Sequence, residues 1–321
     1  MNRPHKITLV VILMILVLVL MFIAALACGK VNLLTIDKEL GSTILFKVRL
    51  PRIILAIIVG MALSVSGVVL QCLLNNPLAD SYTLGISSGA AFGACLAIYI
   101  NITYDINIPT QPMAILFSLM VLIIVIWMAK SKGYLTTSSL VLAGIIVGSV
   151  CSAGVSFLKA LADENATAMI FWLMGNLASK SMKQVLSLGI VILFGIAICM
   201  YYSKELNIMT MGRRESLLVG VNYDRIYKTL LVVCTVMTAF CVSLCGIIGF
   251  VGLVVPHLTR LMVGADNRKI IPISTLMGAS LLLAADTITR SALAHELPVG
   301  VLTTLIGGPF FCYIFMTKRV E

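Results

Sequence analysis

Charged residues are scarce in this sequence of 321 residues. Only 11% are Asp, Glu, Lys or Arg and 60% are hydrophobic, whereas an ordinary soluble domain carries about 25% charged residues. So little charge excludes a water-soluble globular domain. Uncharged runs such as residues 7–29 and 53–77 are long enough to cross a hydrocarbon core of about 30 Å as helices. The composition therefore indicates a helical membrane protein.

Several signatures of catalysis and cofactor binding are also absent. No Gly-x-x-x-x-Gly-Lys-Ser/Thr phosphate loop occurs, so if ATP drives this protein, a separate chain must hydrolyse it. The nine cysteines form no Cys-x-x-Cys pair and the three histidines are scattered. We therefore expect no catalytic residue, no metal site and no cofactor.

The net charge of +10 does not indicate nucleic-acid binding. A DNA-binding domain gathers its basic residues on one solvated face. Here they lie at the ends of hydrophobic segments, which is typical of membrane topology. We expect membrane lipid around the chain and no nucleic acid as a partner.

Ten hydrophobic segments result when the sequence is divided at its charged, Pro-containing and Asn-rich breaks. They predict an all-α membrane protein of about ten transmembrane helices in a single domain over residues 1–321. An even number places both termini on one side. With that side inside, 14 of the 23 basic residues are internal, which favours cytoplasmic termini. The predicted spans cover residues 7–28, 52–74, 84–100, 112–129, 139–161, 184–202, 226–244, 246–263, 270–289 and 297–316.

Ionisable residues are rare inside these spans, and Asp286 and Arg290 are the most informative. They stand one helical turn apart, so we expect an ion pair. A proton relay is the alternative, because intramembrane carboxylates serve ion-coupled carriers. A docking role for Arg290 is the third reading.

Rows of glycine at four-residue spacing, such as Gly85, Gly89 and Gly93, predict close helix packing.

Three stretches resemble the ferric-siderophore, haem and cobalamin (FecCD-type) permease family of ABC importers. The first runs from Arg49-Leu50-Pro51-Arg52 through Asn76-Pro77-Leu78-Ala79-Asp80 to Ala90. The second runs from Gly246 to Arg268, and the third from Asp286 through Glu296-Leu297-Pro298-Val299-Gly300 to Phe311. They follow the family order over residues 49–311. The family's ten helices with cytoplasmic termini agree with the prediction made from the hydrophobic segments.

The resemblance implies a permease subunit in a bacterial cytoplasmic membrane. A second permease chain, identical or paralogous, would complete the pathway. Two ATP-binding subunits would bind inside, and an extracytoplasmic substrate-binding protein would dock outside. Ferric siderophore is the cargo that the resemblance favours, followed by haem and then corrinoid. A secondary transporter driven by an ion gradient is the alternative from another class, and a structural membrane protein is a third.

The resemblance also assigns an ATPase-coupling region within a cytoplasmic loop at about residues 203–228. Arg213 and Arg214 stand where acidic residues are common in the family, and Val219 replaces a leucine. We therefore expect the ATPase of this permease to be less interchangeable with other ATPases of the family than usual. The coupling residues that it implies are Gly212, Arg213, Arg214, Glu215, Leu218 and Gly220.

Two further sites follow from the resemblance. Thr137 and Ser138 align with the short polar side chains that close the inner mouth. From sequence alone, residues 136–139 predict a helix N-cap cluster, and the two roles are compatible. Arg49, Arg52 and Arg290 align with arginines that contact glutamates of the binding protein. Arg49 and Arg52 flank Pro51, which fits the first turn of a helix, and so we expect them at the external rim.

Overall fold

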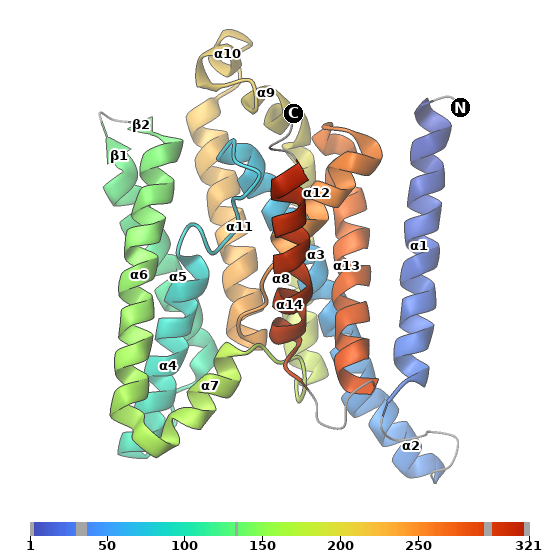
Figure 1. Cartoon of the computed structure of the whole chain (residues 1–321), viewed down its shortest axis with the longest axis vertical. Helices are drawn as coiled ribbons and strands as arrows, with labels where there is room; N and C mark the ends of the chain where they lie inside the picture. The colour runs from blue at the N-terminus through green and yellow to red at the C-terminus, as the bar shows by residue number, and fades with distance from the viewer. Residues whose placement is uncertain (1–2, 30–36, 132–133, 292–296, 318–321) are drawn as a thin grey trace.

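The computed structural model describes residues 3–29, 37–131, 134–291 and 297–317, and these are almost entirely helical (Figure 1). Glu296, which belongs to the third stretch that resembles the permease family, lies outside these ranges. The long helices are α1 (Arg3–Ala27), α3 (Leu50–Leu73), α4 (Ile86–Tyr104), α5 (Thr110–Ala129), α6 (Thr137–Ala162), α8 (Met182–Tyr201), α11 (Tyr223–Cys245), α12 (Val251–Val263), α13 (Asn267–Ser291) and α14 (Val299–Thr317). The short elements are α2 (Lys38–Ile44), the π-helix η1 (Leu45–Arg49), the 3-10 helix η2 (Asp163–Ala166), α7 (Thr167–Leu173), α9 (Ser203–Met209), α10 (Arg213–Leu218), and the paired strands β1 (Lys130–Ser131) and β2 (Tyr134–Leu135).

The all-helical membrane class is confirmed. Within the described residues, eight helices are long and apolar enough to cross a membrane, and the apolar helices at Val251–Val263 and Val299–Cys312 are shorter. Each of the ten predicted segments overlaps one of these helices. The number of crossings and the cytoplasmic side of the termini stay predictions. Figure 1 shows α9, α10, the strands β1 and β2, the start of α1 and the end of α14 at one end of the molecule, which we call the α9/α10 end. The opposite end carries α2 and α7, and we call it the α2/α7 end.

The second predicted span is part of a longer helical stretch. α3 has Pro51 in its first turn, as predicted. Helical backbone nevertheless extends upstream through η1 and α2, so that Lys38–Leu73 forms a stretch of 36 residues. Proline has no N–H to donate to the carbonyl four residues before it. A π-helix, with its wider turn, carries the chain past this position.

The eighth predicted span begins too early. Residues 246–250 are not helical, and α12 has only 13 residues. Gly246 (φ 71°) and Phe250 (φ 66°) have positive φ angles, which a helix does not admit. A Cβ atom at Gly246 would lie 2.2 Å from the Trp172 carbonyl oxygen, so this segment is packed against the C-terminal end of α7. Hydropathy along the sequence reveals neither the positive φ angles nor this close packing.

α3 is the central helix, and almost all of its length is buried. It packs mainly on α13, α11 and α12. Glycine allows these contacts: a Cβ atom at Gly60 would lie 2.2 Å from the carbonyl oxygen of Gly278. The predicted glycine row is confirmed in the same way, since a Cβ atom at Gly93 would lie 2.4 Å from the Met113 carbonyl oxygen.

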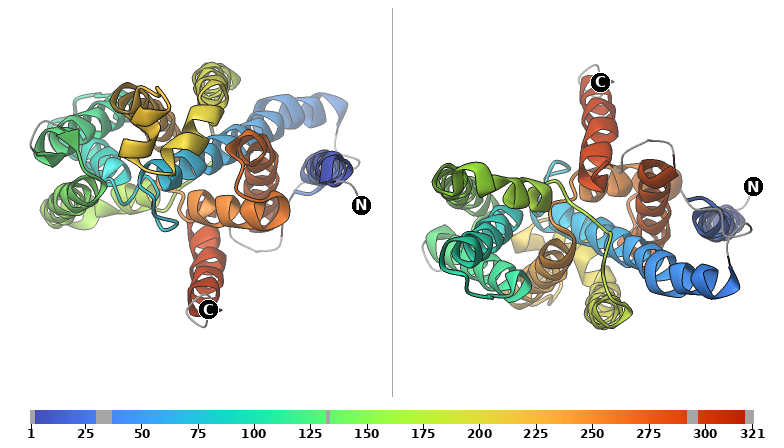
Figure 2. Two further views of the ribbon diagram at one scale, coloured as in Figure 1. Left: turned by 90° about the horizontal axis from the view of Figure 1, so that it is seen from above. Right: turned by 90° about the horizontal axis from the view of Figure 1, so that it is seen from below.

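Two helices lie at the margin of the bundle. Only 6% of the α1 span is buried in the chain, and α1 contacts mainly α13. Figure 2 shows α14, in red, projecting away from the other helices. Both therefore expose apolar side chains along their length.

Candidate functional site

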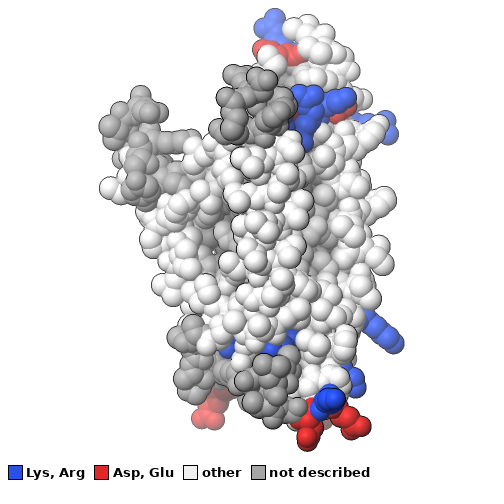
Figure 3. Space-filling model, turned by 90° about the vertical axis from the view of Figure 1, so that its right-hand side faces the viewer, with Lys and Arg blue, Asp and Glu red and all other residues white. Residues whose placement is uncertain are grey.

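Charged side chains gather toward the two ends of the molecule. In Figure 3, a broad uncharged band separates the Lys, Arg, Asp and Glu side chains of one end from those of the other. This is the pattern expected when the band lies in hydrocarbon and the ends lie in water. The candidate sites are consequently at the two ends.

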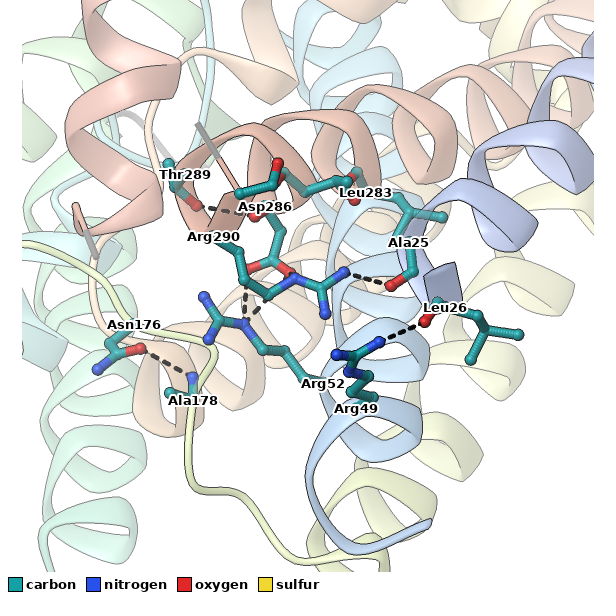
Figure 4. A network of polar contacts seen from close by, with 12 residues as sticks. Ala25, Leu26, Arg49, Arg52, Asn176, Ala178, Leu283, Asp286, Thr289 and Arg290 are labelled. Carbon is teal, nitrogen blue, oxygen red and sulfur yellow. Dashed lines mark hydrogen bonds and ion pairs between the residues drawn. The ribbon is translucent and has the colours of Figure 1, made fainter. Parts of the chain in front are cut away.

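At the α2/α7 end, Asp286 on α13 contacts one arginine from α3 and one from its own helix (Figure 4). Arg52 Nε donates to both carboxylate oxygens of Asp286, at 2.9 and 3.2 Å. Arg290 Nε lies 3.7 Å from the same carboxylate, one helical turn away. Asp286 is fully buried. The predicted pair of Asp286 and Arg290 is confirmed, but Arg52 is the closer partner.

The arginines also hold the end of α1. Arg290 donates to the Ala25 carbonyl at 2.6 Å, and Arg49 donates to the Leu26 carbonyl at 2.6 Å. The last carbonyls of a helix have no partner within it, and cations stabilise its negative dipole end. Arg49 and Arg290 therefore fix the C-terminus of α1, a helix with few other contacts in the chain.

The three arginines predicted to dock a binding protein thus lie together at one end. They are nearly covered by their own chain: Arg49 is 4% exposed, Arg52 8% and Arg290 6%. Docking through them stays a proposal. It requires the neighbouring segments to give way, and the sequence did not indicate this.

At the α9/α10 end, the predicted coupling residues form a compact helix–turn–helix. Gly212 (φ 117°) lies between α9 and α10, and Gly220 (φ 86°) follows α10. Ser216 is buried, and its hydroxyl donates to the carbonyls of Gly212 (2.6 Å) and Ile208 (3.2 Å). The two short helices are therefore held as one unit.

The tip of this unit is apolar and exposed. Leu218 is 81% exposed, and Arg214 and Glu215 are exposed beside it. Other exposed apolar side chains at the tip are Met211, Leu217 and Val219. A group of large exposed apolar side chains with a polar rim is typical of a protein–protein contact.

Arg213 faces its own chain instead. Its guanidinium contacts the Asp224 carboxylate on α11 through two hydrogen bonds, at 2.8 and 3.2 Å. This bidentate pair ties α10 to the first turn of α11. Sequence reasoning identified Arg213 but assigned it to the ATPase contact alone.

Asn207 anchors the unit to α13, and the sequence did not indicate it. Its amide nitrogen donates to Asp266 Oδ1 at 2.8 Å, and its amide oxygen accepts from the Asn267 backbone N–H at 2.8 Å. Arg268 also contacts Asp266, at 2.9 Å. Hydrogen bonds from Arg268 and Asn207 lower the pKa of Asp266 to about 2.

The predicted gate residues stand at the start of α6, at the same end. Thr136 is the N-cap and its hydroxyl accepts from the Ser139 N–H at 3.3 Å, which confirms the predicted cap cluster. Thr137 is half-buried and Ser138 is exposed. Their closure of a pathway stays a proposal.

Within the described ranges, no group of three or more His, Cys, Asp or Glu side chains is placed to hold a metal ion.

Comparisons with known proteins place this arrangement in a family. The FecCD transport family model matches residues 7–317. The cobalamin import system permease BtuC of Halobacterium salinarum is 40% identical over 88% of this chain and 76% of its own length. The hemin transport system permease HmuU of Yersinia pestis is 35% identical over 95% of both chains.

A solved structure supports the same assignment. An ABC transporter of metal-chelate type in an inward-facing conformation matches with a TM-score of 0.86 and 33% identity, over 95% of this chain and 97% of that chain. The sequence motifs, the helical architecture and the comparisons agree. The chain therefore belongs to the FecCD transport family and is a transmembrane ABC transporter permease.

Proposed function

We propose that this permease imports an iron chelate, with ferric siderophore ranked first and haem or a corrinoid next. Relatives named for hemin, iron chelatin and Fe(3+)-citrate transport support iron. Relatives named for cobalamin and molybdate transport show that similar chains serve other cargo. We therefore rank iron first among these cargoes, on the names of the relatives.

The observation that carries the transport mechanism is the exposed apolar tip of α9 and α10. It offers Leu218 to a partner, and its base is fixed to α11 and α13 through Arg213 and Asn207. Two ATP-binding subunits, which contact this tip on the two permease chains, could move α9 and α10 without any ATP site in the permease. Gly212, Arg214, Glu215 and Gly220 then shape the contact.

A second permease chain would complete the pathway. α14 projects from the bundle and exposes Leu305 and Ile306, and a second copy or a paralogue could cover this helix. The pathway would run between the two chains, with Thr137 and Ser138 at its inner mouth. We place the α9/α10 end in the cytoplasm of a bacterial cell and the chain in its cytoplasmic membrane.

An extracytoplasmic binding protein would deliver the chelate to the α2/α7 end. Arg49, Arg52 and Arg290 are the proposed docking residues. Carboxylates of the binding protein would compete there with the α1 carbonyls and Asp286, so docking is expected to loosen the end of α1. Increasing salt should weaken the complex, because charged contacts at a rim govern association.

The ion pairs of Asp286 argue against the alternative of a secondary transporter driven by an ion gradient. Asp286 is the acidic side chain that the sequence offered for a proton relay, and it is neutralised by Arg52 and lies close to Arg290. Its carboxylate is therefore occupied by ion pairs within the chain.

Uptake in cells tests the proposal. The gene would be deleted and the uptake of labelled ferric siderophore, haem and cobalamin measured, with and without a protonophore and with ATP depletion. We expect loss of one iron-chelate activity and dependence on ATP. Uptake that survives ATP depletion but stops with the protonophore would support a secondary transporter instead, and loss of cobalamin uptake alone would overturn the iron assignment.

A further inference from the structure

Gln71, near the end of α3, contacts α12 at the break that Pro256 makes in that helix. Pro256 lies inside α12 and has no N–H, so the Gly252 carbonyl four residues earlier lacks its helical hydrogen bond. Gln71 Nε2 donates to this carbonyl at 3.2 Å. Gln71 is buried, with 4% of its surface exposed. Its amide therefore supplies, from α3, the donor that the proline cannot supply.

Gln71 also contacts α12 on the other side of the break. Arg260 stands one turn after Pro256, and its Nη1 donates to Gln71 Oε1. A guanidinium only donates and a backbone carbonyl only accepts, so these two partners fix the orientation of the amide. One side chain of α3 thus joins the parts of α12 before and after the proline, and we call this contact the Gln71 bridge.

Close packing of the two backbones makes the Gln71 bridge possible. Gly67 lies one turn before Gln71 on the same face of α3. A Cβ atom at Gly67 would lie 2.0 Å from the Gly252 carbonyl oxygen, so only glycine allows this approach. The backbones of α3 and α12 consequently meet at the place where the bridge joins them.

The Gln71 bridge is connected to the coupling unit, which consists of α9 and α10. Cys72 follows Gln71, and its thiol donates to Asn267 Oδ1 at 3.4 Å. The Asn267 backbone N–H in turn donates to Asn207 of α9 at 2.8 Å. Cys72 and Asn267 are both buried. Hydrogen bonds therefore run from the coupling unit, through the start of α13, to the end of α3 that carries the bridge.

We propose that Gln71 and Arg260 are positioning residues that keep α12 rigid across Pro256, so that α12 moves as a whole with the coupling unit. Helices bend most readily at a proline. Without the Gln71 bridge, a displacement of the coupling unit would bend α12 at Pro256 and would not reach its first turns. The inference rests on the proposed function, because it assumes that the ATPase moves α9 and α10.

The ratio of uptake to ATP hydrolysis tests this role. The permease is reconstituted in liposomes with its ATPase and binding protein. Hydrolysis and uptake are then measured together, for whichever of labelled ferric siderophore, haem and cobalamin the parent transports. Gln71→Met keeps the length of the side chain and removes both hydrogen bonds. We expect the uptake per ATP hydrolysed to fall by about tenfold. Loss of folded permease lowers the number of active transporters and not this ratio.

A second substitution separates the bridge from other roles of Gln71. Pro256→Ala restores an N–H at this position, so α12 becomes continuous and no longer needs the bridge. Gln71→Met should therefore cost little in the Pro256→Ala background, a non-additivity that identifies the two residues as one device. Arg260→Met breaks the bridge from the other side and should act like Gln71→Met. Gln111→Met, the same substitution in the first turn of α5, is the matched control.

Hydrogen exchange of the purified permease distinguishes a positioning role from a purely structural one. Gln71→Met should increase exchange in α12, and Pro256→Ala should reverse the increase. If exchange changes but the uptake per ATP does not, or if Pro256→Ala fails to restore the ratio, the inference fails alone. If the parent shows no ATP-dependent uptake, the proposed function fails and the inference fails with it.

Discussion

Asp286 is the residue that holds the α2/α7 end together. It is fully buried between Arg52 and Arg290, and these two arginines belong to helices α3 and α13. Removing the carboxylate leaves guanidinium groups buried without their counter-charge, which costs about 3–5 kcal/mol. We expect Asp286→Asn to lower the midpoint of thermal unfolding of the purified permease markedly.

The exposed pair of Arg213 and Asp224 provides the control. Its side chains are 41% and 45% exposed, and such pairs contribute about 0–1 kcal/mol. Asp224→Asn should therefore leave the unfolding midpoint nearly unchanged. Equal effects of the two substitutions would contradict the structural role of Asp286.

Gly220 requires its backbone conformation and not a close approach. Its φ angle is 86°, and no atom lies within 4 Å of where a Cβ atom would stand. We expect Gly220→Val to strain the turn after α10 and to reduce ATP-driven uptake several-fold, because β-branched residues do not adopt this conformation readily. Gly220→Asn, which tolerates positive φ, should retain most of the uptake. Equal uptake by the two variants would argue against the mapping.

At the scale of the helices, Asn207 is expected to anchor the coupling unit. Its two hydrogen bonds join α9 to the start of α13. Asn207→Ala should therefore increase hydrogen exchange over α9 and α10 by about tenfold, while exchange along α13 stays slow. Exchange monitored by mass spectrometry measures this directly. Lys204→Ala, an exposed position on the same helix, is the matched control.

The acid dependence of this anchor has a definite sign. The pKa of Asp266 is lowered to about 2 from an ordinary value of 3.8. Its contribution to stability is therefore complete above about pH 4 and is lost as the pH falls through 2. The protection of α9 should therefore stay constant between pH 5 and pH 8, because Asp266 remains ionised throughout this range, and a loss of protection within it would contradict this account.

The sequence predicted the helices well because membrane spans depend on length and apolarity. It could not predict the turn at residues 246–250, because this depends on two positive φ angles and on packing against Trp172. It could not predict Arg52 with Asp286 or Asn207 with Asp266 either, since these partners are 234 and 59 residues apart. Local spacing found Asp286 with Arg290, which lie on one helix.

At the scale of the whole molecule, the orientation in the membrane can be tested by labelling. The connection between α4 and α5, which contains Asn107, lies at the α2/α7 end, and α10, which contains Leu218, lies at the opposite end. Both residues are exposed. With the exposed Cys28 and Cys312 replaced, Asn107→Cys should react with an impermeant thiol reagent in intact cells, and Leu218→Cys only after permeabilisation. The reverse pattern would overturn the topology.

The most direct test of the central claim is transport by the purified assembly. The permease, its ATPase and its binding protein would be reconstituted in liposomes, and uptake of a labelled ferric siderophore measured. We expect uptake that requires ATP and that falls at least about tenfold in Leu218→Asp, because a charge on the exposed tip disrupts the apolar contact with the ATPase. Lys204→Ala should transport normally. Uptake driven by an ion gradient without ATP, or unaffected by Leu218→Asp, would contradict the account.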